Sequence, residues 1–204
     1  MPDGSEVQAT RVAFLEFRDE RRLVQEGYEL LDEKRVLLAA EILRQLRAHE
    51  AARRECAALE VRAREAFEAA VARCGFDELS AEPPRDLAPA VLRRETSVFL
   101  GLRLVEAELD THCAGPATGS LRSLPEARGC AVAVLELTAA RARAAAIAVN
   151  LRRLAREYVR TERRARALEN VVLPEIESSL RFIEEQLDAV DQEEVVRVRN
   201  ARPT

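Results

Sequence analysis

Glycine and proline are distributed very unevenly along this chain of 204 residues. Five of the seven glycines and five of the eight prolines fall between residues 75 and 129. These two residue types interrupt regular secondary structure more strongly than any others. We therefore expect a long helix over residues 10–74, an irregular insert over 75–129 and a second long helix over 130–199, all within a single domain.

Both predicted helices carry apolar residues at a seven-residue repeat. In the first helix, eleven of the fifteen repeat positions between Val24 and Arg73 are apolar, and the repeat in the second runs from Ala140 to Val190. A sustained period of 3.5 residues predicts a coiled coil. With only 4% aromatic residues, the chain favours a thin helix–helix seam over a thick core. The residues chosen as structural markers of the seam are Leu31, Leu38, Ile42, Leu154, Tyr158, Leu168, Val172 and Pro174.

Two long helices joined by one insert should fold back on each other. The predicted fold class is all-α: an antiparallel, left-handed coiled-coil hairpin with the insert at its closed end. If Cys74 lies opposite Cys130, the alanine-rich part of the first helix faces the alanine-rich residues 139–148. A parallel arrangement would lose this match of small residues with small residues.

Two local patterns refine this outline. Pro174 interrupts the second helix, but the apolar repeat resumes at Ile176 without a slip, which favours a kinked continuous helix over a helix end. Within the insert, apolar residues alternate with other residues around residues 98–104. That alternation predicts a short strand or one arm of a β-hairpin.

The residue types needed for catalysis do not occur in a suitable pattern. The only lysine, Lys34, is not preceded by the glycines of a phosphate-binding loop, and no dinucleotide-binding fingerprint is present. The two histidines, His49 and His112, have no second pair of ligands at a spacing that binds metal. We therefore predict no catalytic residues, no cofactor and no metal, and assign no enzymatic activity to the chain itself.

The balance of charges and the cysteine pattern limit which partners and which cellular compartment we expect. Acidic residues outnumber basic ones by 36 to 32, so nucleic acid is not an expected partner. The four cysteines form no C-x-x-C pair, and no apolar run approaches the roughly 20 residues that span a bilayer. We expect a cytoplasmic protein that meets the membrane only through a partner.

Arginines gather in three places along the two predicted helices. One interpretation is an ordinary solvated helix surface of mixed charge, and the other is electrostatic contact with an acidic protein partner. The candidate contact residues are Arg11, Arg18, Arg21 and Arg22, then Arg160, Arg163, Arg164 and Arg166, and finally Arg197 and Arg199.

After a run of arginines, the second predicted helix carries Ala167, Leu168 and Glu169, then Val171, Val172 and Pro174. In this order the segment resembles the D subunit of V/A-type rotary ATPases. The family's C-terminal helix has a basic run, then Asn-Ala-Leu-Glu, then Val-Val-Ile-Pro. Arg166 stands here for the asparagine and Leu173 for the isoleucine. The matching residues there are Ala167, Leu168, Glu169, Val171, Val172 and Pro174. The first helix matches the family at Leu23, Gly27, Leu30, Leu31, Lys34, Arg35 and Leu38.

This resemblance implies a non-catalytic central rotor shaft of a proton- or sodium-translocating ATPase or ATP synthase. The shaft would transmit torque between the ring of A and B subunits and the membrane rotor. Its open end would enter the ring, where the arginines above and Glu169 are the candidate contacts. Its closed end would meet the F subunit and the socket subunit, called C or d, above the c-ring.

Two alternatives remain open at this point. The chain could be a cytosolic coiled-coil scaffold or adaptor with no rotary role, which would associate with itself or with an unrelated helix. A helical-bundle metalloenzyme is disfavoured, because such a site needs carboxylates and histidines that converge from several helices.

Overall fold

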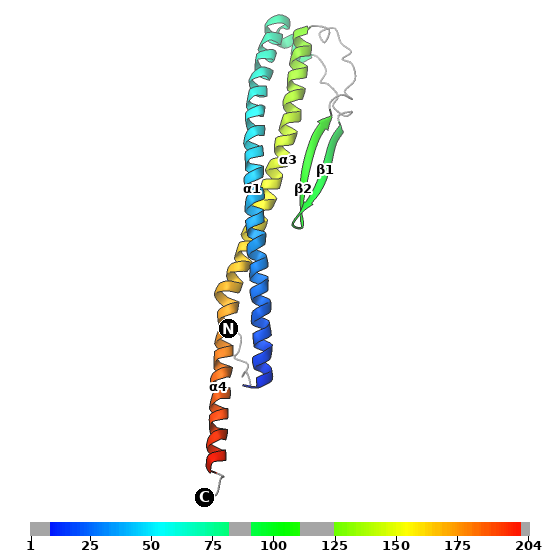
Figure 1. The fold of residues 1–204 in the computed structure, drawn as a ribbon. Coiled ribbons are helices and arrows are strands. Elements are labelled where there is room, and N and C mark those ends of the chain that lie inside the picture. The colour runs from blue at the N-terminus through cyan, green and yellow to red at the C-terminus, as the bar shows by residue number, and fades with distance from the viewer. Residues whose placement is uncertain (1–8, 82–90, 111–124, 201–204) are drawn as a thin grey trace. The chain divides into compact units, whose positions relative to one another are not determined.

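The computed structural model describes residues 9–81, 91–110 and 125–200 (Figure 1). Most of the described chain is helical. The elements are α1 (Arg11–Cys74), α2 (Phe76–Ala81), β1 (Val91–Phe99), β2 (Leu102–Asp110), α3 (Pro125–Ala167), the π-helical turn η2 (Leu168–Val172) and α4 (Leu173–Asn200). The predicted fold class, two long antiparallel helical segments with a β-hairpin in the insert, is confirmed.

The contacts divide the chain into two compact units. Unit 1 combines residues 1–37 with residues 157–204, and unit 2 is the continuous stretch 38–156. Within each unit, a part of α1 runs antiparallel to a later helical segment. In unit 1 the partner segment is the end of α3 with η2 and α4. In unit 2 the partner segment is the remainder of α3, and the β-hairpin belongs to this unit.

The two ends of α1 are set by local chemistry. Thr10 caps the start, because its hydroxyl oxygen accepts a hydrogen bond from the backbone N–H of Ala13 at 3.1 Å. At the other end Gly75 adopts a φ of +85°, and its N–H donates to the carbonyl oxygen of Val71 at 2.8 Å. This left-handed conformation suits glycine, which lacks the Cβ that would clash there. Gly75 therefore ends α1 and allows α2 to begin at Phe76.

The core of each unit is a narrow seam. In unit 2 the seam includes Leu38 and Leu154, both fully buried, and a cluster in which Ala63 packs with Ala133 and Leu137. In unit 1 the buried residues are Thr161, Ala165, Ile176, Leu180 and Ile183. Of the other residues chosen as seam markers, Leu31, Ile42, Tyr158, Leu168 and Val172 are half-buried and Pro174 is exposed.

The expected helix register was wrong. Placing Cys74 opposite Cys130 would put residue 149 opposite Glu55, but Glu55 accepts a hydrogen bond from Arg143 at 2.6 Å. Arg62 likewise pairs with Glu136 at 3.6 Å, where residue 142 was expected. Both pairs shift toward the start of α3, which begins at Pro125 and not at residue 130. A proline is well tolerated in the first turn of a helix, so the helix begins at Pro125, before the expected start at residue 130.

The second long helix passes Pro174 through a π-helical turn. The backbone N–H of Leu173 donates to the carbonyl oxygen of Leu168, five residues earlier. Proline has no N–H to donate and its ring crowds the carbonyl four residues before it. A single wider turn just before the proline relieves that conflict. The helix therefore continues, as favoured from sequence, with a π-turn in place of a simple proline kink.

Replacing Ile183 by alanine should lower the free energy of unfolding by about 2–3 kcal/mol, the lower part of the usual range, because a thin seam can partly close around the gap. Ile183 is fully buried, whereas the neighbouring Phe182 is 49% exposed. Phe182→Ala is thus a matched control that should cost less than about 1 kcal/mol. Urea unfolding followed by circular dichroism measures both. Equal losses in the two variants would show that the seam runs elsewhere.

Candidate partner-binding surfaces

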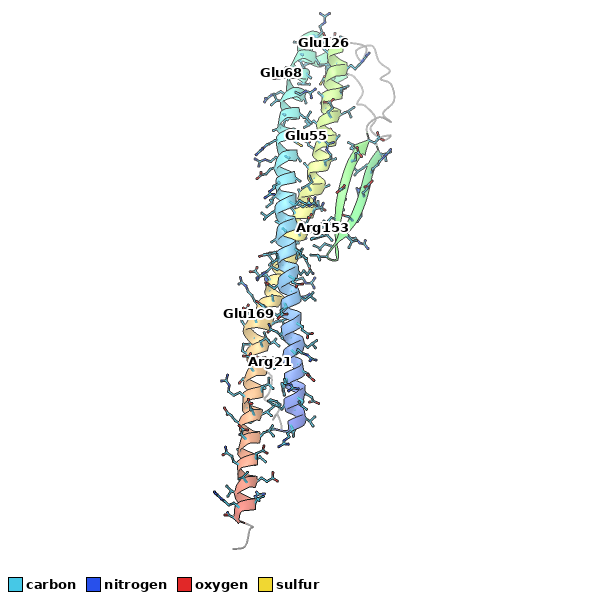
Figure 2. The ribbon with its side chains drawn as sticks, in the orientation of Figure 1. Arg21, Glu55, Glu68, Glu126, Arg153 and Glu169 are labelled. Atoms are coloured by element: carbon cyan, nitrogen blue, oxygen red, sulfur yellow. The ribbon has the colours of Figure 1, made fainter. Side chains whose placement is uncertain are left out.

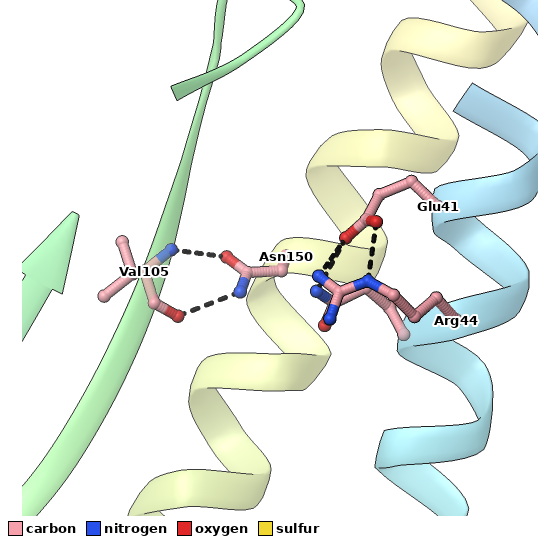
Figure 3. Close-up of polar contacts among 5 residues, drawn as sticks. Glu41, Arg44, Val105 and Asn150 are labelled. Carbon is pink, nitrogen blue, oxygen red and sulfur yellow. Dashed lines mark hydrogen bonds and ion pairs between the residues drawn. The ribbon is translucent and has the colours of Figure 1, made fainter. Parts of the chain in front are cut away.

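The β-hairpin of unit 2 is docked on α3 by one side-chain amide. Asn150 is only 3% exposed. Its Oδ1 accepts a hydrogen bond from the N–H of Val105, and its Nδ2 donates to the carbonyl oxygen of Val105, each at 2.9 Å (Figure 3). An amide carries one donor and one acceptor side by side, as a neighbouring strand would. Asn150 therefore takes the place of a third strand beside β2.

The pairing of the two strands explains why Val105 is free to bond with the helix. Val105 lies opposite Thr96 in the antiparallel ladder. Residues in such a ladder point their backbone N–H and C=O alternately toward and away from the partner strand. The groups of Val105 point away from β1, toward α3. Leu104, next to it, is the buried apolar contact of the hairpin, at 6% exposure.

A second polar contact fixes the end of the hairpin. Arg153 on α3 points toward the hairpin (Figure 2), and its Nη1 donates to the carbonyl oxygen of Arg103 at 2.7 Å. The turn that follows β1 is formed by Leu100 and Gly101, with φ angles of 49° and 84°. Two consecutive positive φ angles define a type I′ turn, the connection that suits the twist of a hairpin. Because Arg103 and Val105 of β2 both bond with α3, β2 faces the helix, while nearly all of β1 is exposed.

A buried carboxylate lies on α1 in the same unit. Glu41 is 8% exposed and accepts hydrogen bonds from Nε and Nη2 of Arg44, each at 2.7 Å (Figure 3). Gln45 donates a third hydrogen bond to Glu41 at 2.9 Å. The bond from Arg44 is the main cause that lowers the pKa of Glu41, against burial, which raises it. The pKa of Arg44 is raised by Glu41 and, more weakly, by the charge of Glu106 on β2.

These groups border a cleft of about 460 Å³ in unit 2, between the hairpin and the two long helices. Arg44 and Gln45 line it from α1, Arg143 and Asn150 from α3, and Glu106 from β2. Arg44 and Arg143 each already pair with an acidic residue, Glu41 and Glu55. The cleft is thus lined by polar side chains of both charges, among them Asn150, which holds the hairpin in place.

Replacing Asn150 by leucine should release β2 from α3 while the hairpin itself stays paired. The amide hydrogen of Val105 is protected only by Asn150, so its exchange with solvent should accelerate about tenfold or more. The amides of Leu104 and Glu106 point toward β1 and should keep their protection. Hydrogen exchange at residue resolution measures all three. Asn170→Leu, at an exposed position, is the control, and unchanged protection of Val105 in Asn150→Leu would contradict the docking role.

Replacing Glu41 by glutamine should destabilise the protein most at neutral pH. Because the pKa of Glu41 is lower in the folded than in the unfolded chain, its stabilisation is complete above pH 4.5 and is lost as the pH falls through the folded value. Arg44 is largely exposed, so we expect a loss of about 1 kcal/mol, or about 2–4 °C in Tm. Thermal melts from pH 7 downward should show the gap between Glu41→Gln and the parent closing below pH 4.5. Glu68→Gln, at an exposed carboxylate, is the control.

All the candidate contact arginines belong to unit 1, and all are exposed. Four of them pair with the chain's own acids: Arg11 with Asp191, Arg22 with Asp19 and Glu26, Arg166 with Glu162, and Arg197 with Glu193. Arg18, Arg21 and Arg22 line a shallow groove that also includes Glu177 of α4. Arg160, Arg163 and Arg164 form no ion pair with any described residue. Arg199 is exposed on α4, and Glu169 is exposed on η2. Arg21 and Glu169 are labelled in Figure 2.

Other candidate chemistry is limited in the described part of the chain. No group of three His, Cys, Asp or Glu side chains there could hold a metal ion, and His112 and Cys113 lie outside the described residues. No described helix is both long enough and apolar enough to cross a bilayer. Cys56, Cys74 and Cys130 are free thiols, and burial raises the pKa of Cys130.

The residues that dock the hairpin are not among those predicted from the sequence. Asn150 lies between Val149 and Leu151 in an apolar stretch, and a lone amide in such surroundings is a usable signal of a buried polar contact. The pair Glu41–Arg44 gave no such signal, because acidic and basic residues three apart are common on solvated helices. Both features depend on where the insert folds, which helical periodicity does not determine.

The geometry defines a class of protein: a helical hairpin with long charged helix faces and a docked β-hairpin. The family described as the D subunit of ATP synthase matches residues 13–202. The D subunit of the A-type ATP synthase of Desulfurococcus sp. is 29% identical over 96% of this chain and 93% of its own length. The D subunit of the V-type ATP synthase of Thermus thermophilus is 29% identical over 97% and 88%, and that of the A-type enzyme of Pyrococcus furiosus is 28% identical over 99% and 96%.

The chain therefore belongs to the family of ATP synthase D subunits. The match extends beyond the two helices that carried the resemblance and includes the insert. The resemblance recognised around Leu168 and Pro174 is confirmed.

Proposed function

We propose that the chain is the central rotor shaft of a V/A-type ion-translocating ATPase or ATP synthase. The observation that carries this proposal is the family match over residues 13–202, on a chain built as a two-helix hairpin. The shaft contributes no catalytic group. It transmits torque between the ring of A and B subunits, where ATP is made or hydrolysed, and the rotor in the membrane. The family match favours this role over that of a cytosolic scaffold.

The contacts inside each unit suit a shaft that transmits torque. Two helices held along a seam resist twisting better than one, and ion pairs reinforce the seam from outside. In unit 1, Nζ of Lys34 meets Glu157 at 2.7 Å, with both side chains largely buried. In unit 2, Arg62, Arg141 and Arg143 of the two long helices pair with acids across the seam. Such pairs add little stability each, but they oppose sliding of one helix along the other.

We assign the contact with the A/B ring to the middle arginine cluster. Arg160, Arg163 and Arg164 are exposed and form no ion pair with described residues, so an acidic partner can engage them without breaking existing pairs. Arg18, Arg21 and Arg199 also form no ion pair with described residues, and Arg11, Arg22, Arg166 and Arg197 already pair within the chain. These seven arginines and Glu169 are secondary candidates. The F subunit and the socket subunit above the c-ring complete the proposed partners. The chain would thus be peripheral to the membrane, on its cytoplasmic side.

Co-expression with the A, B and F subunits, followed by size-exclusion chromatography with mass determination, tests the assembly. We expect one copy of this chain per A/B ring. Elution of the chain apart from an assembled ring would contradict the rotor role.

The double variant Arg163→Glu/Arg164→Glu tests the contact surface within that assembly. Reversing two charges at a complementary interface should weaken retention of the chain on the ring by about tenfold or more. The matched control is Arg53→Glu/Arg54→Glu, an adjacent exposed pair in unit 2, which should assemble like the parent. If both double variants behave alike, the rotor role stands but the contact lies elsewhere.

A further inference from the structure

Strand β1 is the open edge of the hairpin in unit 2. Its neighbour β2 bonds with α3 through Arg103 and Val105. Thr96 lies opposite Val105. Because the backbone groups of Val105 point away from β1, those of Thr96 point away from β2, and so do those of Arg94 and Val98, two residues to either side. No described group hydrogen-bonds the outward N–H and C=O groups of these three β1 residues.

β1 lacks the features that usually protect a sheet edge from other strands. Natural edges are commonly short, bulged, or interrupted by proline or lysine. β1 is nine residues long, contains neither proline nor lysine, and pairs with β2 without a bulge. All of its residues except Phe99 are exposed. The edge is therefore ready to pair with a further strand.

The two faces of the hairpin differ in charge. Side chains alternate between the faces of a sheet, and the face with buried Leu104 borders the cleft, where three glutamates gather. On the other face the charged residues are Arg94 and Arg103, which form no ion pair with described residues. The apolar residues Leu92 and Val98 share that face and are 40% and 72% exposed. The outer face thus favours a partner that brings an acid and apolar side chains.

A second copy of this chain fits the edge poorly. If β1 paired antiparallel with itself over its whole length, Glu95 at its centre would lie opposite the same residue of the other copy. Like charges directly opposite each other destabilise a strand pair. A strand of a different protein avoids this repulsion and can place an acid opposite Arg94.

We propose that the edge of β1 over residues 92–98 binds an extended segment of a partner protein as an additional antiparallel strand. Main-chain hydrogen bonds supply the affinity, and alternate side chains supply the specificity. The partner segment has an acidic residue opposite Arg94 and apolar residues opposite Leu92, Thr96 and Val98. Every residue assigned above to the A/B ring belongs to unit 1, whereas β1 belongs to unit 2. The strand contact does not depend on the rotary role.

Three synthetic peptides of one sequence probe the edge on the full-length chain. The sequence is Val-Thr-Val-Lys-Glu-Thr-Val, which in antiparallel register places its glutamate opposite Arg94 and its lysine opposite Glu95. The first peptide is unmodified. The second is N-methylated at its third and fifth residues, whose N–H groups point toward β1. The third is the matched control, N-methylated at its fourth and sixth residues, whose N–H groups point away.

Fluorescence anisotropy of labelled peptides measures the binding. We expect the unmodified peptide and the control to bind alike, and the second peptide to bind about tenfold or more weakly, because it lacks two main-chain donors. Hydrogen exchange at residue resolution locates the contact. The unmodified peptide should slow exchange at Arg94, Thr96 and Val98 and leave the Val105 amide, which bonds with Asn150, unchanged.

Variants of the chain test the same edge from the other side. Thr96→Pro removes an outward N–H, and proline is tolerated on an edge strand where that group faces solvent. It should weaken binding of the unmodified peptide about tenfold or more, whereas Thr96→Val, which keeps the N–H, should bind like the parent. Arg94→Glu should reverse the charge preference, so that a peptide with lysine at its fifth position binds better than the original. Unchanged protection of Val105 checks that each variant keeps the hairpin docked.

Four results would overturn the proposal. The first two are a lack of binding by the unmodified peptide and equal binding of the two N-methylated peptides. The third is full binding by Thr96→Pro. The fourth is a parent chain that is dimeric while Thr96→Pro is monomeric, because a second copy would then occupy the edge. None of these results bears on assembly with the A/B ring, so failure here and failure of the rotor role are distinguishable.

Discussion

Burial in this protein is one-sided, and most other features follow from that constraint. Each long helix hides one narrow stripe against its antiparallel neighbour and leaves its other faces to solvent. A residue such as Ile183 or Leu154, with no exposed surface, therefore has no second layer behind it. The remaining helix faces must be charged to stay in solution, and the chain supplies 68 charged side chains for them. Stability and partner binding are thus divided between different faces of the same helices.

The buried polar residues fix positions in the fold at the expense of apolar burial. Glu41, Gln45, Asn150 and Thr161 are buried where leucine would bury more apolar area. A buried polar group is costly unless it is hydrogen-bonded, so it tolerates only the arrangement that satisfies it. Asn150 satisfies both of its polar groups at Val105, and a slip of the hairpin by one residue would leave them unpaired. The hairpin is thereby fixed at one position along α3.

The helices, the place of the insert and the family could be predicted from sequence, because each rests on a repeated signal. Heptads and the clustering of glycine and proline are averaged over many residues, and the motif from Leu168 to Pro174 has a fixed order. The register, the π-turn at Leu168 and the site of hairpin docking rest on single residues. Pro125 began a helix where a break was expected, and the register moved with it. Leu100 occupies a positive-φ position that usually signals itself by glycine or asparagine.

The proposed rotor shaft must bind the subunits around it weakly enough to release them as it turns. Paired arginines such as Arg11 and Arg197 are partly neutralised within the chain and can offer only weak, salt-sensitive contacts. Arginines that form no ion pair with a described residue, such as Arg163, give stronger and more specific attraction. Unit 1 thus combines arginines that are already paired within the chain with arginines that form no ion pair to a described residue, all of them on exposed helix faces.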